Sequence, residues 1–329
     1  MMFTMNTGFI RPKAVVLALA ALSATLTSAA VAPPPAGWPT FTYQGVVTNK
    51  TTLKHNPTNE FIFPSIFHAG EHLDAPLGEW YLYYAPHENP GGISLLYADT
   101  PEGPWTEYAN NPVIKNVWAG YSVPHVSSPE ANWNEQAGRL FVYFHGSNSV
   151  TRWAETIDGV TFDYGGVAVE NKMGGPNVTE TSYARVFNHP NPESSYTKAM
   201  FYMGNEKDDI RRIRLAESED GRSWTVSPDY VVAPGSEEGQ NVSGGNFWEW
   251  NGQRYVIYHG SSGKSYARPI DKTLRRVGCT PILLHKSSGV GDDVGRVAAP
   301  DIVTFGGKSY LFYESGDRLG ATIAWARTG

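Results

Sequence analysis

The sequence has 329 residues, a formal net charge of -6 and an aromatic content of 13%. The aromatic content excludes a disordered chain, and an acidic balance without a basic face excludes electrostatic binding of nucleic acid. We therefore expect a folded protein whose partners are not nucleic acids.

The first part of the chain, residues 1–30, is typical of a secretory signal peptide. Arg11 and Lys13 precede the apolar run AVVLALAALSATL, and the following SAAVA fits the small-residue rule for cleavage. Residues 31–329 are then the mature, secreted, extracellular protein. No later run is long and apolar enough to span a bilayer, so we expect no membrane association.

The sequence holds one cysteine, Cys279, which cannot form an internal disulfide. In an oxidising compartment a lone thiol is expected to be buried, and an intermolecular disulfide is the alternative. We favour the buried thiol and a monomeric protein, whose stability must come from its core.

Residues 40–47 alternate like an edge strand, and five similar units follow. Each unit has an apolar strand, a hydrophilic turn, a Tyr-rich strand that ends in a polar residue, a third alternating strand and often a turn into a fourth. Alternation with aromatic and β-branched residues predicts strands rather than helices. The first and second strands of the five units read FIFPSIF and WYLYYAPH, VSSPEANW and RLFVYFHG, SYARVF and AMFYMGN, VSGGNFWEW and RYVIYHG, and AAPDIVTF and SYLFYESG.

Five such units predict an all-β fold, a five-bladed β-propeller of four-stranded antiparallel blades around a central channel. We expect residues 31–329 to form this single domain. The last unit has only three strands before the chain ends, so residues 40–47 are predicted to supply its fourth strand and close the ring.

Alignment of the five units brings two sets of residues to equivalent positions. Because first strands line the channel of a propeller, the first set is expected to meet at its axis. The first-strand set is Ser65, Glu130, Arg185, Asn246 and Asp301, and the second-strand set is Ala85, His145, Met203, His259 and Glu314.

The strand heads SPE and APD, the strand ends YFHG, YHG and YESG, and the outer turns TPEGPW, TIDGVTF and SEDGRSW resemble those of glycoside hydrolase family 43 and related five-bladed propellers. The resemblance covers the whole mature chain at the level of blades. It implies inverting hydrolysis by three carboxylates, in the first, third and fourth blades. In this sequence those positions hold Ser65, Arg185 and Ser243, none of which is acidic.

The remaining acidic residues at the axis are Glu130 and Asp301, with Glu180 just upstream of the third first strand. Glycoside hydrolysis needs a carboxyl group that donates a proton and another that activates water or attacks the sugar. We predict Glu130 and Asp301 as the catalytic pair, with Glu180 as the substitute. The alternative is structural: the carboxylate after the proline binds backbone amides of the next blade and ties the blades together.

The other axial residues are candidates for substrate binding. Arg185 is predicted to pair with a carboxylate or to receive an acidic sugar. His145, His259 and Glu314 are either satisfied hydrogen-bonding groups or hold a structural cation such as calcium in the channel; no cofactor is otherwise required. Ser65 and Asn246 complete the predicted lining of the channel and are also candidates for substrate binding. Trp118 and Tyr183 are predicted to stack on sugar rings, or else to pack between blades.

The leading interpretation is a secreted glycosidase that acts on a plant or microbial polysaccharide or oligosaccharide. A polysaccharide lyase is the second, because it needs a base and a partner for a uronate, which could come from His145, His259, Tyr183 and Arg185. A carbohydrate-binding propeller without catalysis is the third, because the three family carboxylates are missing.

Overall fold

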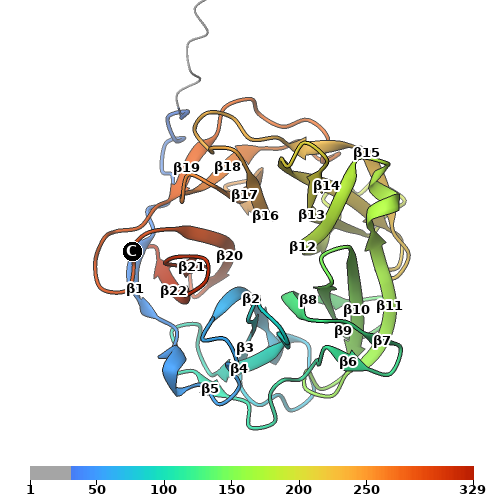
Figure 1. The fold of residues 1–329 in the computed structure, drawn as a ribbon. Helices are drawn as coiled ribbons and strands as arrows, with labels where there is room; N and C mark the ends of the chain where they lie inside the picture. The colour runs from blue at the N-terminus through green and yellow to red at the C-terminus, as the bar shows by residue number, and fades with distance from the viewer. Residues whose placement is uncertain (1–30) are drawn as a thin grey trace, which may run out of the picture.

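The computed structural model describes residues 31–329, so the predicted signal peptide lies outside the described residues. Five four-stranded antiparallel sheets stand radially around one axis, as Figure 1 shows. The predicted five-bladed propeller is confirmed.

The first four blades follow the chain from the innermost strand outward. Blade 1 has β2 (Ile62–His68), β3 (Trp80–Ala85), β4 (Ser94–Ala98) and β5 (Thr106–Glu107); blade 2 has β8 (Val126–Asn134), β9 (Arg139–Gly146), β10 (Val150–Thr156) and β11 (Asp163–Glu170). Blade 3 has β12 (Val178–Asn188), β13 (Lys198–Glu206), β14 (Arg211–Ser218) and β15 (Thr225–Val232); blade 4 has β16 (Val242–Trp250), β17 (Gln253–Gly260), β18 (Ser265–Pro269) and β19 (Ile282–His285).

Blade 5 is closed by the start of the described chain. It holds β20 (Val297–Phe305), β21 (Lys308–Ser315), β22 (Thr322–Arg327) and, at its outer edge, β1 (Thr42–Val46). β1 pairs antiparallel with β22, so that Thr42 lies opposite Arg327. The predicted closing strand is confirmed, and it covers an edge that would otherwise be open.

Short elements connect the blades. They are the hairpin of β6 (Val117–Trp118) and β7 (Tyr121–Ser122), and the 3-10 turns η1 (Lys50–Thr52), η2 (Ala69–Glu71) and η3 (Asn171–Gly174). No helix in the described part of the chain is long and apolar enough to cross a membrane.

Every innermost strand carries the same β-bulge near its start. In each blade the pairing with the second strand shifts by a residue, and the residue at the bulge has a left-handed backbone. Few residues other than glycine adopt this conformation, so its fivefold repeat marks a constraint common to all blades. The five residues are Phe63, Ser128, Tyr183, Gly244 and Ala299.

The outer turns hold neighbouring blades together. Asp158 and Asp220 bind the backbone amides of their own turns, as expected for turn chemistry. The glycines that follow them accept hydrogen bonds from buried tyrosines of the preceding blade: Tyr83 donates to Gly159 at 2.6 Å, and Tyr143 to Gly221 at 2.7 Å.

The prediction of a buried cysteine is wrong, because Cys279 is exposed on the connection between β18 and β19. The preceding Gly278 donates its N–H to Pro269 O, which pins that part of the connection to the blade and leaves the next residue facing solvent.

Candidate functional site

The five first-strand residues meet at the axis, as predicted. Because each lies two residues after the left-handed residue of its bulge, the repeat of the backbone sets the repeat of the side chains. Ser65, Glu130, Arg185, Asn246 and Asp301 are all buried and are joined by hydrogen bonds or ion pairs. We call this set the hub.

Arg185 is the centre of the hub. One guanidinium nitrogen, Nη1, lies 2.7 Å from Oε2 of Glu130 and 3.7 Å from Oδ2 of Asp301. The other, Nη2, donates to Pro64 O at 2.8 Å. A single side chain from blade 3 therefore contacts blades 1, 2 and 5. The contact with Glu130 confirms the predicted ion pair between Arg185 and a carboxylate.

The hub residues also bind the backbone of neighbouring blades. Ala131 N donates to the hydroxyl of Ser65 at 2.9 Å, Val186 N to Glu130 at 3.4 Å, and Ile66 N to Asp301 at 2.9 Å. Each donor belongs to the blade that follows around the ring. The structural alternative is thus what the contacts show: these carboxylates tie blades together.

Burial dominates the electrostatics of the hub. Burial raises the pKa of Glu130 to about 7, although Arg185 opposes the shift. Burial also raises the pKa of Asp301, again against Arg185. Two carboxyl groups share one guanidinium in a desolvated site, so the protonated form of each is favoured relative to water.

Two aromatic rings fill the axis beside the hub. Phe63 of blade 1 and Tyr183 of blade 3 belong to non-adjacent blades, yet their ring centroids lie 5.1 Å apart. They pack with Ala299 in one buried cluster and leave a cavity of only about 10 Å³ next to Arg185. A sugar ring does not fit in this space, so the catalytic role of Glu130 and Asp301 stays a prediction that the packing does not favour.

The axis opens at the end where first strands begin and second strands finish. A pocket of about 210 Å³ lies there, between blades 3, 4 and 5. We call it the axial pocket; its lining residues are Tyr183, Arg211, Asn241, Ser243, His259, Gly260, Ser261, Arg296 and Arg318.

The predicted second-strand residues also lie at this end. Ser127 pairs with His145, Ser243 with His259 and Ala298 with Glu314, so the predicted alignment of the second strands is confirmed. His259 accepts a hydrogen bond from Ala299 N at 3.1 Å through Nδ1. Burial, followed by the charges of Arg296 and Arg211, holds the pKa of His259 well below its usual value.

His145 is the least satisfied of these residues. It is 1% exposed, and neither ring nitrogen has a hydrogen-bond partner among residues 31–329. Its ring centroid lies 5.6 Å from that of Tyr183 and 5.4 Å from that of His125. Burial, followed by the nearby His125, holds the pKa of His145 well below its usual value, so the imidazole is neutral.

Two carboxylates lie at the open end of the axis. Glu180 accepts a hydrogen bond from Ser182 at 3.0 Å, and its other oxygen lies 3.5 Å from Nη2 of Arg211. Glu314 accepts from Phe63 N at 3.2 Å and from Arg296 at 2.7 Å. The Glu180 side chain is 12% exposed and that of Glu314 is 1% exposed, so Glu180 is the more accessible of the two.

Trp118 is not brought to the axis. It lies on the β6–β7 hairpin, which Figure 1 places at the outside of blade 2 beside β11. Its ring packs near Tyr121 and Tyr164, with centroids 6.2 and 6.3 Å away. The packing alternative describes this tryptophan better than a stacking role at the axis.

The predicted cation in the channel stays a prediction. Within residues 31–329, no group of three or more His, Cys, Asp or Glu is arranged to hold a metal ion. At the hub, the guanidinium of Arg185 supplies the positive charge that two buried carboxylates need.

Sequence reasoning missed the arginines of the axial pocket. Arg211 starts β14, Arg296 directly precedes β20, and Arg318 lies in the β21–β22 turn. None of them falls in a first strand or at a second-strand end. The topology of a blade could have indicated two of them, because the loops that join second to third strands lie at the same end of the axis as the starts of the first strands.

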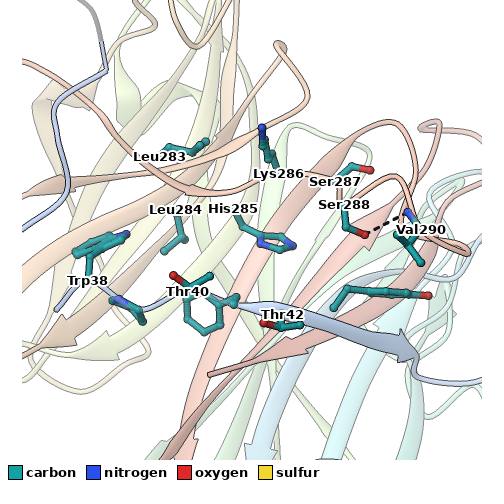
Figure 2. Close-up of a pocket in the computed structure, with 13 residues that line it drawn as sticks. Trp38, Thr40, Thr42, Leu283, Leu284, His285, Lys286, Ser287, Ser288 and Val290 are labelled. Atoms are coloured by element: carbon teal, nitrogen blue, oxygen red, sulfur yellow. Dashed lines mark hydrogen bonds between the residues drawn. The ribbon is translucent and has the colours of Figure 1, made fainter. Parts of the chain in front are cut away.

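A larger pocket of about 510 Å³ lies on the outside of the ring, between β19 and β1 (Figure 2). Leu284 and His285 come from the β19 side, and Thr40 and Thr42 from the β1 side. None of its lining residues is acidic, and none of them is a residue predicted for the site.

Solved structures share this fold. An α-L-arabinofuranosidase from Lactobacillus brevis is 15% identical, with a TM-score of 0.57 over 83% of this chain and 92% of that chain. An α-L-arabinofuranosidase from Podospora anserina in complex with cellotriose is 11% identical, with a TM-score of 0.58 over 89% of this chain and 97% of that chain. A family 43 endo-arabinanase from Bacillus licheniformis is 13% identical, with a TM-score of 0.53 over 82% of this chain and 94% of that chain.

The chain therefore has the five-bladed propeller fold of family 43 glycoside hydrolases and their structural relatives, as the resemblance predicted. No protein-family model matches the sequence, and no curated protein matches it.

Proposed function

We propose that the protein is a secreted glycoside hydrolase that cleaves a polysaccharide or oligosaccharide at the open end of the propeller axis. The observation that carries this proposal is the axial pocket of about 210 Å³, because its lining residue Arg211 lies 3.5 Å from the carboxylate of Glu180. The glycosidases that share the fold support it.

Glu180 is the proposed acid/base residue. Its carboxylate is held by the Ser182 hydroxyl and lies near Arg211, so its orientation is fixed while 12% of the side chain is exposed. A carboxyl group so placed can protonate the leaving glycosidic oxygen or take a proton from the attacking water. Glu314 is held by two donors and orients Arg296.

The binding surface is polar and aromatic. Tyr183 is one of its lining residues, and Asn241, Ser243 and Ser261 offer hydrogen-bonding groups for the hydroxyls of a sugar. The hub beneath this surface keeps the five strands in register and takes no direct part in the reaction.

The test is a screen of plant and microbial polysaccharides for new reducing ends. Glu180→Gln is the active-site variant, and Glu249→Gln, on an exposed side chain of β16, is the matched control. The proposal requires product from the wild type and the control, and loss of product with Glu180→Gln. Product formation that does not depend on Glu180 would remove the assigned role.

A lyase is the second candidate, and one observation favours it. Neutral, buried His145 has two unpartnered ring nitrogens and stands beside Tyr183, which lines the axial pocket together with Arg211 and Arg318. Such a base, together with arginines that neutralise a uronate, suits proton abstraction next to a carboxylate. A lyase gives an unsaturated product that absorbs ultraviolet light and carries no added water.

A non-catalytic carbohydrate-binding propeller is the third candidate. It is favoured by Ser65, Arg185 and Ser243, which stand where the resemblance implies three carboxylates. Binding to an oligosaccharide without any product after prolonged incubation would establish this reading over the other two.

A further inference from the structure

Every charged residue that lines the axial pocket is an arginine. Arg211 comes from β14, Arg296 from the residue directly before β20 and Arg318 from the β21–β22 turn, so three separate segments bring the same charge to one space. No acidic residue is among the lining residues. Arginines repel one another, and a protein gathers them where an anion is to be bound.

Protein carboxylates do not neutralise these arginines fully. Arg296 pairs with Glu314 through Nη2, but its buried Nη1 has no hydrogen-bond partner in the described part of the chain. Nη2 of Arg211 lies 3.5 Å from Oε2 of Glu180, which is longer than a direct hydrogen-bonded ion pair. Within residues 31–329, no carboxylate lies within 4 Å of Arg318.

Arg318 is held by a histidine instead. Its Nη2 lies 3.0 Å from Nε2 of His87, and the other nitrogen of His87 lies 3.1 Å from Glu88. Because the guanidinium of Arg318 donates, Nε2 of His87 accepts, and Nδ1 of the ring can then donate to Glu88. The two contacts of the imidazole hold Arg318 in a fixed orientation. Arg318 is exposed at the mouth of the pocket.

The effect of this charge is visible on neighbouring groups. After burial, the charges of Arg296, Arg211, Arg185 and Arg318 lower the pKa of His259. Arg211 and Arg318 lower the pKa of Tyr183, although burial raises it overall. Groups on two sides of the pocket thus experience a positive field.

We propose that the axial pocket binds an acidic saccharide, whose oxyanion is held by the guanidinium groups of Arg318 and Arg296. This inference rests on the proposed function and names the substrate class of the same site. The carboxylate of a uronic acid and the sulfate ester of a sulfated sugar share the required chemistry. Guanidinium binds both oxyanions with paired hydrogen bonds.

The remainder of the lining fits a sugar better than a free anion. The oxyanion site is flanked by the Tyr183 ring and by Ser243, Ser261 and the Asn241 side chain. Several neutral polar groups beside an aromatic residue suit a hydroxylated ring that carries the anion, and the volume of the pocket exceeds what a small inorganic ion needs.

The experiment is direct binding on an array of uronate, sulfated and neutral oligosaccharides of matched length, followed by calorimetric titration of the tightest binder and its neutral counterpart. We expect acidic glycans to bind and their neutral counterparts to bind at least about tenfold more weakly. The uronate and sulfate arms identify the source of the oxyanion. Binding of neutral glycans alone, or of none of the acidic ones, overturns the proposal.

Three variants locate the site. Arg318→Gln is expected to weaken binding of the acidic glycan about ten- to a hundredfold and to leave the neutral one unchanged. Arg318→Lys keeps the charge and restores part of the loss. Arg276→Gln, on an exposed arginine of the β18–β19 connection, is the matched control and should bind like the wild type. An Arg318→Gln protein with unchanged affinity contradicts the proposal.

Binding and reaction fail independently in this design. Acidic glycans that bind but are never hydrolysed leave the inference standing and remove the proposed hydrolase. Hydrolysis of a neutral glycan by a protein that binds no acidic glycan removes the inference and leaves the proposed hydrolase standing.

Discussion

Glu130 of blade 2 and Arg185 of blade 3 form a buried ion pair at the propeller axis, with 2.7 Å between Oε2 and Nη1. The same guanidinium contacts Asp301 and the backbone of blade 1. This geometry makes Arg185 the shared counter-charge of two carboxyl groups rather than a member of one isolated pair.

Arg185→Met should therefore destabilise the protein strongly, because it leaves two buried carboxyl groups without their partner. We expect a loss of about 3–5 kcal/mol in the free energy of unfolding near neutral pH. The loss should shrink near about pH 5, because Glu130 is then protonated in the folded state and the raised pKa of Asp301 also favours its protonated form. Chemical denaturation at the two pH values measures it.

The double variant Glu130→Gln with Arg185→Met controls for packing, and it should be less destabilised than Arg185→Met alone at neutral pH. A single variant that loses less than about 1 kcal/mol would show that the hub charges are not coupled in this way.

Replacement of Glu180 and of Glu130 should separate catalysis from stability. Glu180→Gln is expected to lower the rate of hydrolysis about a hundred- to ten-thousandfold with little change in stability. Glu130→Gln should change stability and leave the rate per folded molecule near that of the wild type. The opposite pattern, measured by initial rates and thermal unfolding, would restore the predicted pair of Glu130 and Asp301 as catalysts.

Buried His145 should make the protein sensitive to acid. Its pKa in the folded state is well below the ordinary value, so as the pH falls below about 6.5 the unfolded chain binds a proton that the folded chain does not. The free energy of unfolding must then fall, by at most about 1.4 kcal/mol per pH unit for this group. His145→Gln should show a shallower fall between about pH 6.5 and 5.

His68→Gln, at the opposite end of β2 from the axial pocket, is the control for that series. Stability curves of the wild type and His145→Gln that run parallel in this pH range would mean that His145 takes up a proton in the folded state as readily as in the unfolded one.

The predictions from sequence that rested on the five repeated units were confirmed. Ser65 and Asp301 lie far apart in the chain, yet equivalent positions in two units were enough to place both at the axis. The closing strand followed from the same count of strands, because blade 5 lacked one.

The depth of the site could not be predicted in this way. The bulges turn Phe63 and Tyr183 into the axis, where they seal the space beside Glu130 and Asp301. A left-handed backbone at Phe63 or Tyr183 has no signature in a single sequence. Arg318 was missed for a related reason, since a turn residue belongs to no strand pattern.

The closing of the ring can be tested at Phe41, which directly precedes β1 and is buried against blade 4. Phe41→Ala should cost about 3–5 kcal/mol, as expected for a large side chain removed from a core. Thr42→Ala, on the exposed neighbour, should stay within about 0.5 kcal/mol of the wild type. Equal effects of the two substitutions in chemical denaturation would contradict the role of this segment as a packed closure.

The most direct measurement of the proposed function is the mass of the reaction products formed in heavy-oxygen water. Hydrolysis at Glu180 predicts one heavy oxygen in each new reducing end, and no such product from Glu180→Gln. Products that are unsaturated and carry no heavy oxygen would contradict hydrolysis at the axial pocket.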